Sequence, residues 1–248
     1  MRTVRTVDLE TTGSRPPAHA VCEIGWQDVV ERPDGKWELS ATYGATLVDP
    51  GRDIPAVTQA VHHIVDADVF GAPRWDDVAP GVLRGDFIAL AAHRASFEQN
   101  FCTPKWTAGA AWICTYKCAL RLFPDSPGFS NQMLRYWRRP EGLRRERGLP
   151  VHRALPDAYV TAHHLRDMLN MAGPAQLIAW SALPGLLPRV RWGDDRGAHF
   201  EELSTDRLVQ MTRDRDEDLR FTAAHHLALR GEGEDPARRP PPPQPELF

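Results

Sequence analysis

The sequence of 248 residues contains only three lysines, four cysteines and no long apolar run. No stretch of 18 apolar residues occurs, so we expect no membrane-spanning helix and no membrane partner. The first residues lack the apolar core of a signal peptide. The cysteines form no CxxC pair, which indicates reduced thiols in a cytoplasmic protein.

Arginine makes up 27 of the 30 basic residues, and the formal net charge is −3. An average of this sign argues against a nucleic-acid partner, but the charge is unevenly distributed. The window from Arg135 to Arg153 holds seven arginines and two glutamates, with Tyr136 and Trp137 between them. This composition is typical of a groove that follows a phosphate backbone, and the alternative is a solvated helix face. We expect substrate contacts from the following side chains: Arg144, Arg145, Arg147 and Arg153.

Alternating and apolar segments predict strands over Thr3–Leu9, Val21–Val30 and Trp37–Val48. Helical and strand-like segments then alternate, and the apolar stripe of Leu155–Met171 predicts a long helix. This order is typical of an α/β fold with a mixed sheet flanked by helices. The expected domains are a catalytic domain (1–172), a small α-rich appendage (173–230) and a Pro-rich tail without fixed structure (231–248).

Acidic residues occur in three places where a strand or helix end can present them. Asp8 and Glu10 share one face of the first strand, and Glu98 follows a short apolar strand. His152 precedes the long helix, and Asp157 lies in its first turn. Like charges side by side are unfavourable unless a cation lies between them. Each pattern alone is common on protein surfaces, but the combination is much more specific.

The segments VDLETTG, AHRASFE and HRALPDA resemble, in this order, the three motifs of the DEDDh family of 3′→5′ exonucleases in the RNase H-like superfamily. The resemblance covers residues 3–170. Glu23-Ile24-Gly25 and Val61-His62-His63-Ile64 are similar to further segments of that family. The resemblance implies an RNase H-like mixed sheet and a nuclease activity.

In that family, the matching carboxylates would bind two Mg²⁺ or Mn²⁺ ions: Asp8, Glu10, Glu98 and Asp157. His152 would be the general base, and backbone groups of Thr11 and Thr12 would hold the terminal nucleotide. The implied reaction releases nucleoside 5′-monophosphates from DNA 3′ ends, in DNA repair or in trimming during replication.

Two residues depart from the family pattern. Glu98 stands where the family has Asp, and Arg94 stands where it has Asn. In one interpretation Glu98 still binds metal and Arg94 contacts a phosphate. In the other, Arg94 pairs with Glu98 and the site is weak, which would leave an adaptor that binds DNA ends or a sliding clamp.

The C-terminal third contains Trp192–Gly197, which resembles a turn in the extension of exonuclease X-type members. This resemblance favours DNA as the substrate, with an RNA 3′→5′ exonuclease as the alternative. The last five residues are similar to the peptide by which bacterial repair proteins bind the sliding clamp, so contacts are expected from Gln244, Leu247 and Phe248.

Two remaining groups of residues carry no metal-site prediction. Cys114 and Cys118 have the spacing of one helical face and are expected to be buried thiols. His163 and His164 are expected on a helix surface.

Overall fold

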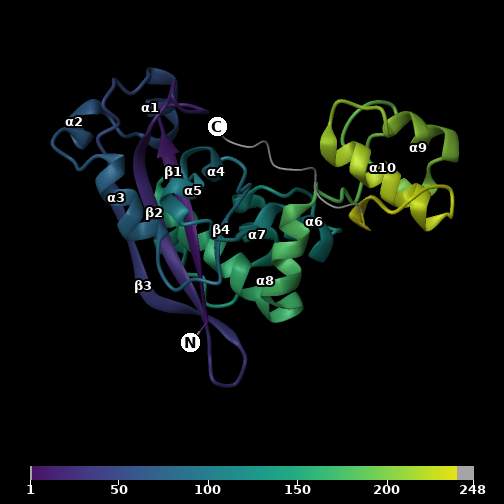
Figure 1. The fold of residues 1–248 in the computed structure, drawn as a ribbon, viewed down its shortest axis with the longest axis horizontal. Helices are drawn as coiled ribbons and strands as arrows, with labels where there is room; N and C mark the ends of the chain where they lie inside the picture. The colour runs from purple at the N-terminus through teal and green to yellow at the C-terminus, as the bar shows by residue number, and fades with distance from the viewer. Residues whose placement is uncertain (1, 239–248) are drawn as a thin grey trace. The chain divides into compact units, whose positions relative to one another are not determined.

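The structure, a computed structural model, describes residues 2–238 (Figure 1). These residues divide into two compact units. The first contains the chain up to Ala119 together with Ser126–Ser181, and the second contains Leu120–Asp125 and the residues from Ala182 on. The strands are β1 (Thr3–Thr11), β2 (Val21–Glu31), β3 (Trp37–Leu47), β4 (Ala89–Ala92) and β5 (Trp112–Cys114). The α-helices are α1 (Ala56–His62), α2 (Asp66–Val69), α3 (Trp75–Leu83), α4 (Glu98–Phe101), α5 (Pro104–Thr107), α6 (Thr115–Leu122), α7 (Asn131–Arg138), α8 (Ala154–Ala182), α9 (Thr205–Met211) and α10 (Glu217–Leu229).

The five strands form one mixed sheet in the order β3-β2-β1-β4-β5. The three long strands are antiparallel neighbours, whereas β4 runs parallel to β1, and β5 runs parallel to β4. Because parallel neighbours end at the same edge of a sheet, the loop after β4 arrives beside the end of β1. The expected α/β fold and mixed sheet are confirmed.

Helices α3 and α8 cover opposite faces of this sheet. Arg5 Nη1 donates to the carbonyl of Val82 in α3 (2.7 Å), whereas Thr6 Oγ1 donates to the carbonyl of Ala158 in α8 (3.3 Å). Successive side chains of a strand point to opposite faces, so Asp8 and Glu10 share the face of Thr6. Both carboxylates therefore point toward the first turn of α8.

Strand β2 and the start of α8 approach each other closely at Gly25, which lies opposite Asp8 in the sheet. A Cβ atom at Gly25 would lie less than 3.0 Å from backbone atoms of Ala154 and Leu155. Glycine is required here because a larger residue has no space. The backbone conformation does not require it, since φ at Gly25 is not in the left-handed region. The contact fixes the start of α8 against the sheet.

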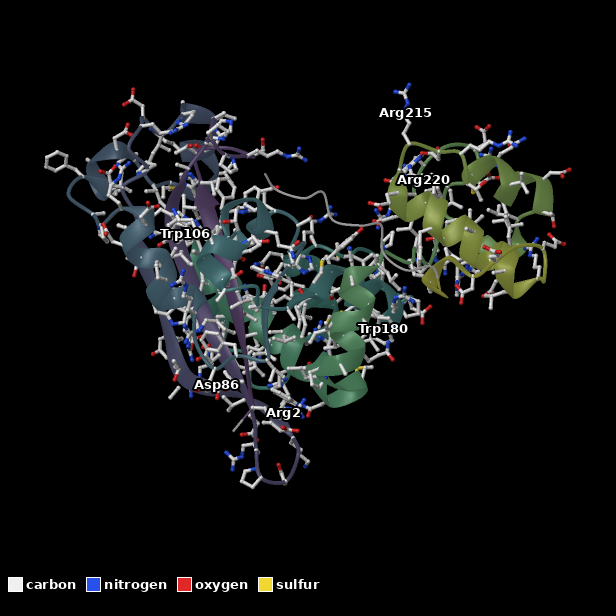
Figure 2. All side chains as sticks on the ribbon, viewed as in Figure 1. Arg2, Asp86, Trp106, Trp180, Arg215 and Arg220 are labelled. Atoms are coloured by element: carbon white, nitrogen blue, oxygen red, sulfur yellow. The ribbon has the colours of Figure 1, made fainter. Side chains whose placement is uncertain are left out.

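The second unit is small and mostly helical, as expected for the appendage. Ser204 and Asp216 cap α9 and α10 by accepting backbone N–H groups. Two side chains of α10 hold the segment that follows α8: Asp218 accepts from the N–H of Gly185 (2.6 Å), and Thr222 accepts from the N–H of Leu187 (2.9 Å). Figure 2 shows Arg215 extending away from this unit, whereas Arg220 turns back to bond the carbonyls of Asp214 and Arg215.

The predicted boundary at 172/173 coincides with Gly173 (φ 71°, ψ 164°), whose non-helical backbone divides α8 into two helices, whereas the compact units divide after Ser181. The domain boundaries stay predictions. Of the predicted tail, residues up to 238 are described, and Pro236–Arg238 forms a 3-10 turn. The proposed clamp-binding residues Gln244, Leu247 and Phe248 lie outside the described residues. Within residues 2–238, no helix is long and apolar enough to cross a bilayer.

The expected position of two histidines on a helix surface was wrong, whereas the expected burial of the cysteine thiols is confirmed. His163 and His164 are buried, with exposed fractions of 3% and 0%, because α7 and the segment after it cover this part of α8. Cys114 and Cys118 do not share a helix face, since Cys114 ends β5 and Cys118 lies in α6. All four cysteines are buried free thiols.

The close approach at Gly25 generates a stability prediction. Gly25→Ala should lower the free energy of unfolding by about 1–3 kcal/mol, because the added methyl group overpacks rigid backbone. Gly81→Ala is the matched control: it lies in α3, and its Cβ would meet no atom within 4 Å. That change should stabilise by about 0.5–1 kcal/mol. Urea unfolding measures both, and equal effects would contradict the packing argument.

Candidate active site

Three carboxylates meet at the end of β1 and the start of α8. One oxygen each of Asp8, Glu10 and Asp157 lies within 4.8 Å of the other two. We call these three residues the acidic triad. Two members come from one strand face and the third from the first turn of the helix packed on that face. The sequence prediction named all three, and the structure brings them together.

Neutral donors orient the helical member of the triad. The backbone N–H of His152 donates to Asp157 Oδ2 (2.6 Å), and Gln132 Nε2 donates to Asp157 Oδ1 (2.8 Å). Asn131 Nδ2 donates to the backbone carbonyl of Asp157 (3.2 Å). Both amide side chains come from α7, and neither was predicted to contribute to the site.

Glu23 holds the loop that carries His152. Its carboxylate accepts two hydrogen bonds from the Arg153 guanidinium (2.9 and 2.6 Å) and one from the N–H of Ala154 (2.9 Å). The register of the sheet places Glu23 opposite Glu10, so this pair lies beside the triad. Arg153, a predicted substrate contact, is therefore bonded within the protein, where its positive charge faces the carboxylates.

The carboxylates raise one another's pKa values in this buried setting. Burial raises the pKa of Asp8 well above its usual range, and the nearby Asp157, Glu10 and Glu98 raise it further. Burial, Asp157 and Glu23 raise the pKa of Glu10 to about 8, with Arg153 opposing them. Burial also raises the pKa of Asp157, and the His152 N–H and Gln132 oppose that shift. The site therefore favours protons or a bound cation.

Glu98 lies next to the triad but outside it. Its side chain is 3% exposed, and its Oε2 atom has no hydrogen-bond partner. Burial raises its pKa to about 8, and Glu10 adds to the shift. His93 fixes the preceding loop: its ring contacts Thr115 Oγ1 (3.0 Å) and the Phe129 carbonyl (2.8 Å). A buried carboxylate with an unsatisfied oxygen beside three others is suited to a divalent cation.

The exposed groups at the site are His152 and Arg94. Both have a left-handed backbone (φ 60° and 66°) and side chains open to solvent. The Arg94 guanidinium lies over the Tyr116 ring, 4.2 Å from its centroid. Among the ion pairs of residues 2–238, none joins Arg94 to Glu98. The interpretation in which Arg94 neutralises Glu98 is wrong.

Thr11 and Thr12 are buried. The Thr12 backbone N–H donates to the Ala20 carbonyl (2.9 Å), and the Thr11 hydroxyl donates to the Gly13 carbonyl (2.7 Å). The Thr12 N–H is therefore engaged inside the protein. Buried His62 lies nearby: its Nδ1 accepts from the Ile64 N–H (3.1 Å), and a hydrogen bond with the Thr11 backbone raises its pKa against the larger effect of burial. Its role in holding residue 11 was not predicted.

The basic window separates into inner and outer arginines. Arg135 is buried and bonds the carbonyls of Gly148 (2.6 Å) and Arg145 (2.9 Å). Arg138 pairs with Asp167 (2.7 Å). These arginines fix the segment 139–148 onto α8. The outer arginines have exposed side chains: Arg139, Arg144 and Arg145.

Comparisons with known proteins agree with this geometry. No family model matches the chain. Exodeoxyribonuclease 10 of Escherichia coli (strain K12) is 32% identical over 203 residues, which cover 81% of this chain and 85% of that protein. The chain belongs to the exodeoxyribonuclease 10 family. The exonuclease resemblance seen in the sequence is thereby confirmed.

Solved structures of exonucleases share the fold of this family member. Exonuclease X in complex with 5′ overhanging duplex DNA superposes with a TM-score of 0.57 and 32% identity, over 72% of this chain and 99% of that one. Exonuclease I of E. coli in complex with a dA16 oligonucleotide gives a TM-score of 0.54 at 11% identity, over 73% of this chain and 43% of that one. The latter likeness shows the fold alone.

The raised pKa values generate a prediction about metal and pH. The folded protein without metal keeps protons on Glu10 and Glu98 up to about pH 8, whereas the unfolded chain loses them near pH 4. The free energy of unfolding should therefore fall as the pH rises from about 4 to about 8. Saturating Mg²⁺ or Mn²⁺ should raise the melting temperature more at about pH 8 than at about pH 5.

Differential scanning calorimetry with and without the metal measures this difference. Asp157→Asn should lose most of the stabilisation by metal, because it removes a triad oxygen. A metal-induced shift that is the same at both pH values, or that survives in Asp157→Asn, would count against a cation at the triad.

Proposed function

We propose that the chain is a 3′→5′ exodeoxyribonuclease that uses two Mg²⁺ or Mn²⁺ ions and acts in DNA repair or in trimming during replication. The observation that carries the proposal is the acidic triad, with buried Glu98 beside it and exposed His152 at its edge. Four carboxylates of this kind form a hard-oxygen donor set, which these cations prefer. When bound, the ions would supply charge stabilisation for the phosphodiester and activate the attacking water.

The protein groups then have separate tasks. Asp8, Glu10 and Asp157 would hold the cations, and Glu98 would complete the set with its unpartnered oxygen. Glu23 and Gln132 are positioning residues, since they act through Arg153 and Asp157. His152 would accept the proton of the water, because it is exposed at the edge of the triad on a loop tied to Asp157.

Further proposed substrate contacts come from the exposed cations around the site. Arg94 lies on the loop that carries Glu98, and Arg144 and Arg145 extend from the basic window. Arg153 would act mainly by fixing the protein, because Glu23 holds its guanidinium, whereas Arg147 would contact a phosphate of the substrate. DNA is favoured over RNA by the relatives named exodeoxyribonuclease and by the solved complex with duplex DNA.

A single assay separates the candidate functions. Single-stranded DNA and RNA of equal sequence, each carrying a radioactive label in every internucleotide phosphate, are incubated with Mg²⁺. Nucleoside 5′-monophosphates from DNA are the expected result. Products from RNA alone would favour the RNA exonuclease, and no products from either would favour the adaptor.

Glu98 gives a matched pair of variants. Glu98→Gln keeps the size of the side chain but removes its charge, so it should lower kcat at least about 100-fold. Its stability should be unchanged or higher, because an uncharged amide is easier to bury than a carboxylate. Glu98→Asp, which installs the residue usual in the family, should keep substantial activity. Steady-state kinetics with thermal unfolding measures both, and full activity in Glu98→Gln would remove this residue from the site.

A further inference from the structure

A cavity lies along α8, away from the acidic triad. Its volume is about 810 Å³, and its walls come from α8, the start of β3 and the segment 141–147. From α8 it is lined by Tyr159, His163, Arg166 and Asn170, which share one helix face. Asp157 lies roughly on the opposite side of the same helix. We call this space the α8 cavity.

The α8 cavity has an excess of positive charge. Of its acidic residues, Asp167 is paired with both Arg138 (2.7 Å) and Arg166 (2.6 Å), and Glu38 is paired with Arg32 (3.2 Å). By contrast, Lys36, Arg144 and Arg147 have no acidic partner among the ion pairs of the described residues. Glu141 is the remaining acidic side chain in the lining. Three cations therefore face one unpaired carboxylate.

Arg147 is held in place without a counter-charge. Its guanidinium lies between two aromatic rings, 4.6 Å from the centroid of Tyr43 and 4.3 Å from that of Tyr159. One nitrogen also donates to Gln27 Oε1 (3.4 Å). The Tyr159 hydroxyl accepts a hydrogen bond from the backbone N–H of Arg144 (3.0 Å) and so holds this part of the cavity wall in place. Fixing these groups before a ligand arrives lowers the entropy that binding must overcome.

His163 supplies an independent sign of a missing ligand. The residue is 3% exposed and lines the α8 cavity, and neither ring nitrogen makes a hydrogen bond of good geometry, although the Glu141 carbonyl lies close enough to raise the pKa of the ring. Its ring packs edge-on against Tyr159, with centroids 4.7 Å apart. Burial and Arg166 lower its pKa to about 4, although Asp167 and the Glu141 carbonyl act in the opposite direction. At neutral pH the ring is uncharged and has one N–H to donate, and a buried polar group without a partner is unfavourable.

We propose that the α8 cavity binds a phosphate group, with Lys36, Arg144 and Arg147 balancing its charge and His163 donating to a phosphate oxygen once its ring, whose nitrogens are covered in this structure, turns toward the cavity. Arginine and lysine side chains bind phosphate by charge-assisted hydrogen bonds. The phosphate belongs either to a nucleic-acid strand that continues beyond the triad or to a free nucleoside monophosphate, the product of the proposed reaction. The identity of the ligand rests on the proposed function, whereas the phosphate site itself does not.

The first test is direct binding. Inorganic phosphate and dTMP are titrated into the full-length protein while the His163 imidazole signals are followed by NMR, with assignment from His163→Gln. Saturable shifts that are lost in Lys36→Gln are the expected result. No shift with either anion overturns the proposal, and shifts that do not depend on Lys36 overturn this set of ligating residues.

The second test identifies the source of the phosphate. With long single-stranded DNA, Lys36→Gln and His163→Gln should raise KM roughly 3- to 10-fold and leave kcat unchanged. With thymidine 5′-(p-nitrophenyl phosphate), which reaches only the triad, both variants should match the original protein. Lys105 is an exposed lysine of the same unit outside the cavity. Lys105→Gln is therefore the control and should leave kcat and KM unchanged with both substrates.

The outcomes separate the two proposals. A raised KM for the strand alone assigns the site to the DNA backbone. NMR shifts with unchanged KM assign it to the free nucleotide. Equal losses on both substrates indicate a structural role for the two residues and overturn the phosphate site. If the protein cleaves neither substrate, the proposed function fails, while the NMR titration still decides whether phosphate binds.

Discussion

Mutual repulsion among buried carboxylates is the constraint on which the rest of this structure depends. Asp8, Glu10 and Asp157 lie within 4.8 Å of one another, and Glu98 is buried beside them. No favourable contact among these groups holds them together, so the sheet and α8 must do so. Packing of α8 onto β2 at Gly25 and hydrogen bonds from neutral donors to Asp157 therefore oppose a repulsion that a bound cation would remove.

The same constraint explains why some arginines of the basic window are bonded inside the protein and others are exposed. Arg153 places a positive charge beside the carboxylates and is itself neutralised by Glu23. Arg135 bonds the carbonyls of segment 139–148 and also donates to Gln132 Oε1 (3.1 Å), the residue that orients Asp157. The inner arginines thus support the triad through α7 and the loop before α8. The outer ones have exposed side chains that a polyanion can reach.

The long strands were predictable because they depend on local patterns of apolar residues, whereas the triad was predictable because its segments resemble the motifs of a known family. Helix α7 was not, because Met133, Tyr136 and Trp137 are exposed while Leu134 and Arg135 are buried, which is no ordinary apolar stripe. His164 was placed on the surface because its covering partners, Arg138 and Asn131, come from that unpredicted helix. The role of Glu23 depends on strand register, which residue types alone do not specify.

Glu98 departs from the family pattern, and its buried surroundings determine what this change does to the site. Glu98 begins the short helix α4, and its carboxylate lies outside the triad with one oxygen unsatisfied. Without a cation, protonation is the most favourable state of such a group, and burial raises its pKa to about 8 accordingly. With a cation at the triad, the longer side chain can carry an oxygen toward it and release the proton. Binding of metal at this site would therefore be coupled to loss of protons near neutral pH, and the added methylene would determine how far the carboxylate can reach.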